Sequence, residues 1–88
     1  MTEPSADQQA KFGAAVARSK TLKERPDNVT LLRLYALYKQ ASEGDLQEPK
    51  PGALDFVASA KWSARDALRG VSRAEAMGHY IALVDSLA

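Results

Sequence analysis

The segment YALYKQASEGD, residues 35–45, decides the fold of this chain. Tyr35, Tyr38 and Lys39 stand at positions i, i+3 and i+4, so on a helix their side chains leave one face within a single turn. Aromatic rings beside an ammonium group can stack a base and hold a phosphate. Spacing alone, however, favours two core tyrosines beside a solvated lysine. The segment therefore predicts a helix and leaves the role of its polar face open.

Four helices are expected when this pattern is followed outward in both directions. Alanine and leucine dominate the chain, and no segment alternates apolar and polar residues over a useful length. Turn residues separate the helical segments, which cover about residues 6–23, 28–44, 53–69 and 73–88. We therefore predict an all-α fold, a small antiparallel four-helix bundle, with a single domain over residues 1–88.

Local signals set the expected helix ends. Either Asp27 or Asn28 can cap the start of the second helix. Ser72 and Glu75 fit the S-x-x-E capping box, in which each side chain accepts from the other residue's amide, at the start of the fourth. Gly70 is suited to the position that closes the third helix, because glycine adopts the left-handed conformation without strain. These signals predict where the chain turns.

Apolar spacing predicts which faces are buried. The first helix is expected to end at Arg25-Pro26, because the residue before proline is disfavoured in a helix. The predicted faces are Phe12, Ala15, Val16, Ser19 and Leu22 in the first helix, Phe56, Val57, Ala60, Ala64 and Leu68 in the third, and Met77, Tyr80, Ile81, Val84 and Leu87 in the fourth. Trp62 is expected on another face of the third helix.

Composition excludes several function classes. Of the 88 residues, 45% are hydrophobic and 26% are charged, as in a folded domain, and cysteine is absent. The chain therefore has no thiol nucleophile, and its single histidine, His79, has no partner for a histidine zinc site. The formal charge of +1 is too small for a protein that binds DNA or RNA through a broad positively charged surface. We expect neither a metal site nor a nucleic-acid partner.

The N-terminal residues argue against export. Residues 1–8 are polar and hold two acids, unlike the basic and apolar regions of a leader, and no apolar run reaches the length that spans a bilayer. We expect a soluble cytoplasmic protein that starts at its own Met1 and does not insert stably into a membrane.

Other residues could carry chemistry, and each also has a plainer interpretation. Lys61 directly precedes Trp62, so their side chains point about 100° apart and one can reach a site while the other is buried. Taken singly, Lys61 is a surface lysine, Trp62 a core anchor and Tyr80 a core residue with its hydroxyl at the rim. His79 has no serine or acid at a spacing that indicates a triad. A basic helix end, which could also steer an anion, contains Arg18, Lys20, Lys23 and Arg25.

Three motifs follow one another in a specific order. Residues 35–45 read Y-x-x-Y-K-Q-A-x-x-G-D, residues 51–55 read P-G-x-x-D, and residues 60–62 read A-K-W. This ordered set resembles the acyl-CoA-binding protein family, also called the diazepam-binding inhibitor family. The similarity continues through Gly70, Ser72, Ala76 and Tyr80-Ile81, and spans the chain from Phe12 to Val84.

The resemblance implies a four-helix bundle whose shallow bowl holds a medium- to long-chain fatty-acyl-CoA. In the family, lysines meet the 3′-phosphate of the adenosine and a tyrosine stacks on the adenine. The positions that match the family's head-group residues are Tyr35, Tyr38, Lys39, Lys61, Tyr80 and Lys20. Phe12, Val16 and Leu32 match the acyl-chain groove. The resemblance further implies a monomeric carrier that needs no cofactor and catalyses no reaction.

Two departures from the family pattern keep other functions open. Arg65 stands where the family usually has a second tryptophan, and Arg69 replaces a common lysine. An interaction module that has lost its ligand is favoured if Arg65 blocks the bowl. A hydrolase that uses His79 on the thioester is the remaining alternative, and it predicts that acyl-CoA is consumed with time.

Overall fold

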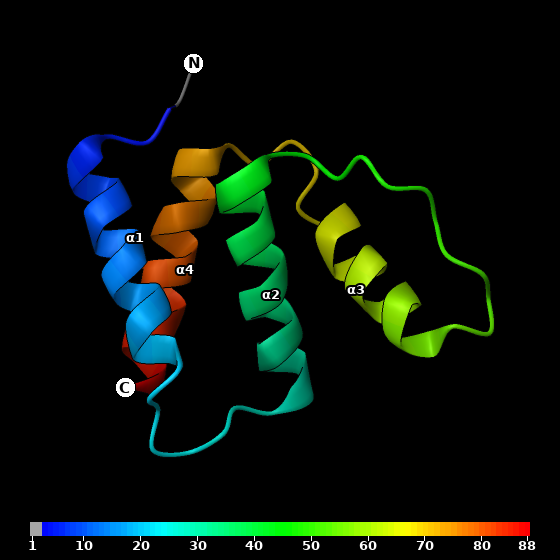
Figure 1. Cartoon of the computed structure of the whole chain (residues 1–88), viewed down its shortest axis with the longest axis horizontal. Coiled ribbons are helices and arrows are strands. Elements are labelled where there is room, and N and C mark those ends of the chain that lie inside the picture. Colours follow the sequence, from blue (N-terminus) through cyan, green and yellow to red (C-terminus); the bar gives the residue numbers. More distant parts are fainter. Residues whose placement is uncertain (1–2) are drawn as a thin grey trace.

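Helices account for all the regular secondary structure in the described part of the chain, residues 3–88 of a computed structural model (Figure 1). The expected start at Met1 lies outside the described residues. The helices are α1 (Ala6–Ser19), α2 (Asn28–Glu43), α3 (Phe56–Asp66) and α4 (Arg73–Leu87). α1 and α4 run in one direction and α2 and α3 in the other (Figure 1). The predicted all-α, four-helix fold is confirmed.

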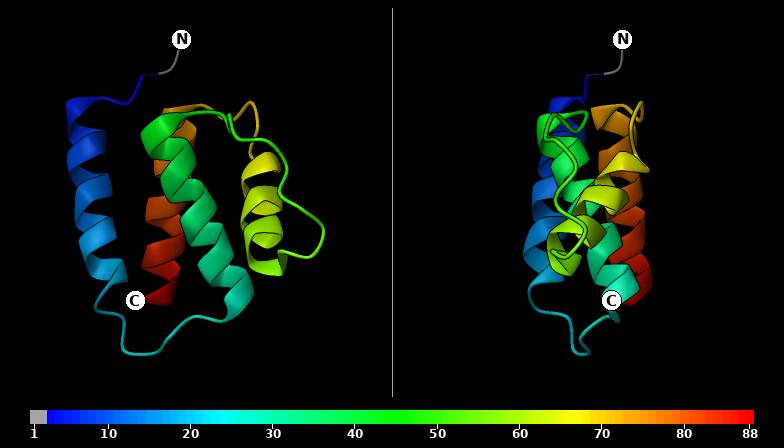
Figure 2. Two further views of the ribbon diagram at one scale, coloured as in Figure 1. Left: turned by 45° about the vertical axis from the view of Figure 1, so that its right-hand side comes forward. Right: turned by 90° about the vertical axis from the view of Figure 1, so that its right-hand side faces the viewer.

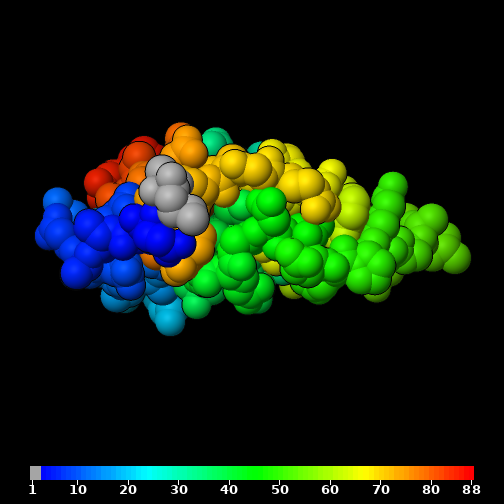
Figure 3. All heavy atoms as spheres, turned by 90° about the horizontal axis from the view of Figure 1, so that it is seen from above, coloured from blue at the N-terminus to red at the C-terminus, as the bar shows by residue number. Residues whose placement is uncertain are grey.

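The helices are arranged in a thin slab. α4 packs against both α1 and α2, whereas α3 packs against α2 alone among the helices. The Cα atoms extend over 40 × 36 × 14 Å, and Figure 2 shows the narrow edge of the molecule. Seen from above, the loop that precedes α3 forms one end of the molecule (Figure 3). A slab of this kind leaves much of each helix facing solvent.

Two helices are shorter than the sequence predicts. α1 ends at Ser19, because the amides of Lys20 and Thr21 bond three residues back and tighten the last turn before Pro26 is reached. α3 begins at Phe56, since the Asp55 carboxylate caps it by accepting from the Ala58 amide at 3.1 Å. Residues 67–69 then continue as a turn, in which the amides of Leu68 and Arg69 bond three residues back. The predicted ends were therefore wrong by three or four residues.

The start signals of α2 and α4 are confirmed, whereas Gly70 does not close α3, because α3 already ends at Asp66. Asp27 caps α2 through the Thr30 amide. At the start of α4, Ser72 and Glu75 make both bonds of the capping box. Gly44 and Gly70 have φ angles of 83° and 89°, in the left-handed region that glycine occupies without strain.

The core lies between α1, α2 and α4, and α3 contributes little to it. The buried apolar cluster contains Phe12, Ala15, Leu34, Leu37, Ala41, Ala76, Met77, Tyr80 and Val84. The apolar face predicted for the start of α3 is wrong, because Phe56 and Val57 are 75% and 69% exposed. These two residues stand at the end of a helix that contacts only α2.

Gln40 and Asp45 join the end of α2 to the loop before α4. Gln40 is buried, and its Nε2 donates to Asp45 Oδ1 at 2.8 Å and to the Val71 carbonyl at 2.7 Å. The Gly70 amide donates to the same Asp45 oxygen at 2.9 Å. This amide, and secondarily the Gln40 side chain, lowers the pKa of Asp45 below its usual range.

Replacing Asp45 by asparagine is expected to make the unfolding free energy less sensitive to acid. Because the pKa of Asp45 is lowered in the folded protein, its carboxylate stabilises the fold above the unfolded pKa of about 4. This stability is lost as the pH falls through the folded pKa. Urea titrations from neutral pH into acid should therefore show a steeper loss for wild type than for Asp45→Asn. Asp7→Asn, which removes an exposed carboxylate paired with Lys11, controls for the charge, and matching profiles for the two variants would contradict the expectation.

Candidate functional site

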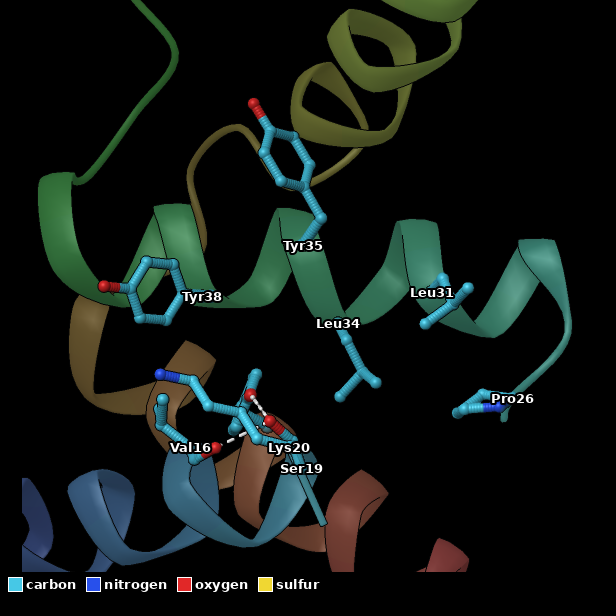
Figure 4. A pocket seen from close by; sticks show the side chains of 9 residues that line it. Val16, Ser19, Lys20, Pro26, Leu31, Leu34, Tyr35 and Tyr38 are labelled. Atoms are coloured by element: carbon cyan, nitrogen blue, oxygen red, sulfur yellow. Dashed lines mark hydrogen bonds between the residues drawn. The ribbon is translucent and has the colours of Figure 1, made fainter. Parts of the chain in front are cut away.

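A cavity of about 330 Å³ opens between α1 and α2 (Figure 4). Its lining is Val16, Ser19 and Lys20 from α1 and its C-cap, Pro26 from the connecting loop, Leu31, Leu34, Tyr35 and Tyr38 from α2, and Tyr80 from α4. Figure 4 shows Lys20 extending toward the Tyr38 ring. Tyr80 forms part of the floor, and its hydroxyl donates to Ser19 Oγ at 3.1 Å.

Tyr38 presents a ring to solvent above a floor of aromatic residues. The Phe12 ring stacks near it at a centroid distance of 5.9 Å with 24° between the planes. Phe12 also meets the Tyr80 ring edge-on at 5.1 Å. Tyr38 is 41% exposed, whereas Tyr80 is 4% exposed. The core-tyrosine interpretation therefore fits Tyr80, while Tyr38 offers a supported surface on which a planar group can stack.

A second, mostly apolar cavity of about 510 Å³ lies between α2 and α3. Its lining is Arg25, Asn28, Leu31, Leu32, Tyr35, Phe56, Val57, Ala60 and Lys61. The exposed Phe56 and Val57 are thus walls of this cavity. Leu31 and Tyr35 line both cavities, so the two spaces meet along this edge of α2.

Tyr35 also stands beside two cations. The Nζ atom of Lys61 lies 5.4 Å from the centroid of the Tyr35 ring, within the range of a cation–π contact. Lys39 Nζ is paired with Glu43 Oε2 at 2.8 Å. Glu43 raises the pKa of Lys39, and the nearby Tyr35 adds to this effect. The edge between the cavities therefore combines a ring, a hydroxyl and positive charge.

Five of the six head-group residues expected from the sequence line one or both of these cavities, and Lys39 lines neither. Tyr35, Tyr38, Tyr80 and Lys20 line the first cavity, and Lys61 lines the second. The three residues expected in an acyl-chain groove do not share one groove. Phe12 is buried beneath the rings, Val16 lines the first cavity, and Leu32 lines the second.

Leu31, Phe56 and Val57 are among the lining residues that the sequence did not predict as part of the site. Leu31 belongs to both cavities, and its helical spacing to Leu34 and Tyr35 was the available signal. Helical spacing predicts that Phe56 and Val57 belong to the core, because spacing does not distinguish a buried face from a cavity wall.

His79 is exposed on α4. Within residues 3–88 no group of His, Cys, Asp or Glu side chains could hold a metal ion.

Arg65 anchors the loop after α2 and lines a smaller, neighbouring cavity that also includes Tyr35 and Lys61. Its Nη2 donates to the Gly44 carbonyl at 2.7 Å, and its side chain is only 3% exposed. Trp62 supports the same loop by donating from Nε1 to the Glu48 carbonyl at 2.9 Å. Arg65 is not among the residues that line the first or the second cavity, so it does not close them.

Comparison with known proteins shows that this chain is similar to the members of one family. The model of the family described as "Acyl CoA binding protein" matches residues 9–84. Acyl-CoA-binding protein homolog 1 of Caenorhabditis elegans is 47% identical over 76 residues, which are 86% of this chain and 88% of that protein. The crystal structure of Oryza sativa acyl-CoA-binding protein 2 superposes with a TM-score of 0.86 at 38% identity, covering 91% of this chain and 89% of that one.

A longer relative contains the same region. Enoyl-CoA delta isomerase 2 of Rattus norvegicus is 49% identical over 79 residues, which are 90% of this chain but 20% of the isomerase. The chain therefore spans about a fifth of that relative, and the similarity concerns that part alone. Along residues 3–88 no helix has the length and apolar character needed to cross a bilayer.

Proposed function

Because the chain belongs to the acyl-CoA-binding protein family, we propose that it binds medium- to long-chain fatty-acyl-CoA thioesters reversibly. The family is one of binding proteins and not of enzymes. The proposed role is to buffer and carry these thioesters for fatty-acid metabolism, as a single cytoplasmic domain that acts as a monomer. One observation carries the proposal: Tyr35, which has Lys61 beside its ring, is shared by a cavity lined with three tyrosines and Lys20 and by a mostly apolar one.

The first cavity, together with the two lysines beside Tyr35, suits the CoA head group. A CoA carries roughly four negative charges at neutral pH, mostly on its phosphates. We infer that the adenine stacks on Tyr38, beside Lys20, and that Lys39 and Lys61 meet the 3′-phosphate near the Tyr35 hydroxyl. Lysine suits this contact because its ammonium is a compact charge with three donors. A few placed cations can do this in a chain whose formal charge is only +1.

The second cavity suits the acyl chain. Its walls are mostly aliphatic and aromatic, and its volume of about 510 Å³ is in the range of small-molecule sites. We infer that the chain lies between Leu32 on α2 and Phe56 and Val57 on α3. Phe12 then supports the rings from below, and Val16 contacts the head group. This assignment also explains why two apolar residues of α3 are solvent-exposed in a folded domain.

Calorimetric titration with palmitoyl-CoA tests the proposal. One-to-one binding is expected, with free CoA and palmitate each at least about a hundredfold weaker, because each lacks one of the two contributions. All ligands are used below their aggregation limits. Absence of binding at every chain length would overturn the proposal and favour the interaction module. Time-dependent loss of thioester, abolished in His79→Ala, would favour the hydrolase.

A further inference from the structure

Lys39 is not a free cation in this chain. Its ammonium is paired with Glu43, one helical turn along α2, at 2.8 Å. The two side chains are 31% and 53% exposed, so the pair is accessible to a ligand that reaches Lys39. A phosphate that binds Lys39 must therefore share the ammonium with a carboxylate or displace it.

Arg65 provides a second cation for the same carboxylate. Its Nη1 lies 3.7 Å from Glu43 Oε1, while the pair with Lys39 uses Oε2. The guanidinium is held in place, because Nη2 donates to the Gly44 carbonyl and the side chain is almost fully buried. Glu48 approaches the same Nη1 at 3.9 Å and does not pair with Lys39. Glu43 therefore stands between an accessible, flexible cation and a buried, fixed one.

We propose that Glu43 and Arg65 together set how strongly the site selects ligands with a terminal phosphate monoester. The proposal rests on the proposed function. Glu43 competes with the phosphate for Lys39, and Arg65 limits this competition by attracting the carboxylate as the phosphate arrives. Glu43 therefore has a cationic partner both without ligand, when it pairs with Lys39, and with ligand, when it pairs with Arg65. Its carboxylate is not left unpaired when Lys39 binds the phosphate. Glu43 and Arg65 are thus positioning residues that act on the ligand through Lys39.

The experiment compares palmitoyl-CoA with palmitoyl-(3′-dephospho)-CoA, and the readout is the ratio of their affinities. Glu43→Gln removes the competing charge and keeps the side chain's shape, so it should raise the ratio about fivefold, the size of a half-exposed ion pair. Affinity for the dephospho ligand should change by less than about twofold. Glu48→Gln is the matched control, because it removes one carboxylate beside Arg65 without touching Lys39. It should raise the ratio much less than Glu43→Gln does, because it acts on Lys39 only by leaving Arg65 freer to attract Glu43.

A second variant tests the part that Arg65 plays. Arg65→Met keeps an unbranched apolar stem and removes the alternative cation, so Glu43 stays on Lys39 and the ratio should fall about threefold. Adding Glu43→Gln to Arg65→Met should restore the ratio of the Glu43→Gln protein. A merely structural role for Arg65 would weaken both ligands equally.

The outcomes separate this inference from the proposed function. If wild type binds palmitoyl-CoA and Glu43→Gln leaves the ratio within about twofold of wild type, the competition is absent and the inference fails. If Glu48→Gln raises the ratio as much as Glu43→Gln, the effect is one of general charge, and the inference also fails. If wild type binds neither ligand, it is the proposed function that fails.

Discussion

Replacing Lys39 and Lys61 together by alanine is expected to lower the affinity for palmitoyl-CoA by about a thousandfold. Each lysine should contribute a charge-assisted contact to the phosphate worth about 2 kcal/mol, and two such losses amount to about three decades in Kd. Titration calorimetry or competition with a fluorescent acyl-CoA measures the change. Both side chains lie outside the buried core, so the fold should be retained.

Two controls make this result specific. Lys11→Ala with Lys23→Ala removes the same net charge from exposed positions outside the two cavities and should weaken binding only by the loss of long-range attraction. Palmitoyl-(3′-dephospho)-CoA should bind wild type and the Lys39, Lys61 double variant with similar affinity. An equal loss for both ligands would mean that the lysines act on some other part of the head group or on the fold.

The affinity of wild type is expected to rise about two-hundredfold from octanoyl-CoA to palmitoyl-CoA. Full burial of one methylene contributes about 0.8 kcal/mol to the binding free energy. Palmitoyl-CoA has eight more methylenes than octanoyl-CoA, and half burial of each gives the stated gain in affinity. Val57→Asp should reduce this gain to about tenfold or less, because it places a charge on the cavity wall. Measuring Kd over the series of chain lengths gives the slope for each protein.

Val29→Asp is the matched control for the chain-length experiment. Val29 and Val57 are the same residue type and are both 69% exposed, but Val29 is not among the residues that line the α2–α3 cavity. The two substitutions therefore add the same charge and should have similar, small effects on the free energy of unfolding. If both variants kept the wild-type slope, the acyl chain would have to lie elsewhere.

Local sequence signals predicted the parts of this fold that depend on a few neighbouring residues. The capping residue of α2, the capping box of α4 and the left-handed conformation of Gly70 are such cases, because each is decided within one turn of the chain. The end of α1 is different. Ser19 donates to the Val16 carbonyl and accepts from the Tyr80 hydroxyl, a residue 61 positions away, and no local pattern contains that contact.

The candidate site was predictable in its members but not in their arrangement. Spacing placed Tyr35 and Tyr38 on one helical face, and the structure shows that only Tyr38 has its ring exposed above an aromatic floor. Spacing assigned Phe56 and Val57 to the core, since periodicity identifies an apolar face without identifying what covers it. The direction of Arg65 was also beyond sequence reasoning, because its acceptor is a backbone carbonyl 21 positions away.

The attachment of α3 to α2 alone has a thermodynamic consequence. We expect a helix that packs against only one other helix to open more readily than the three-helix core unfolds. The second cavity, between α2 and α3, exists only while α3 is packed against α2. A ligand in this cavity therefore binds only the closed molecules, and its apparent affinity depends on the equilibrium between the closed and open forms. Substitutions in the loop contacts of Trp62 or Arg65 can thus change affinity through this equilibrium, at a distance from every atom of the ligand.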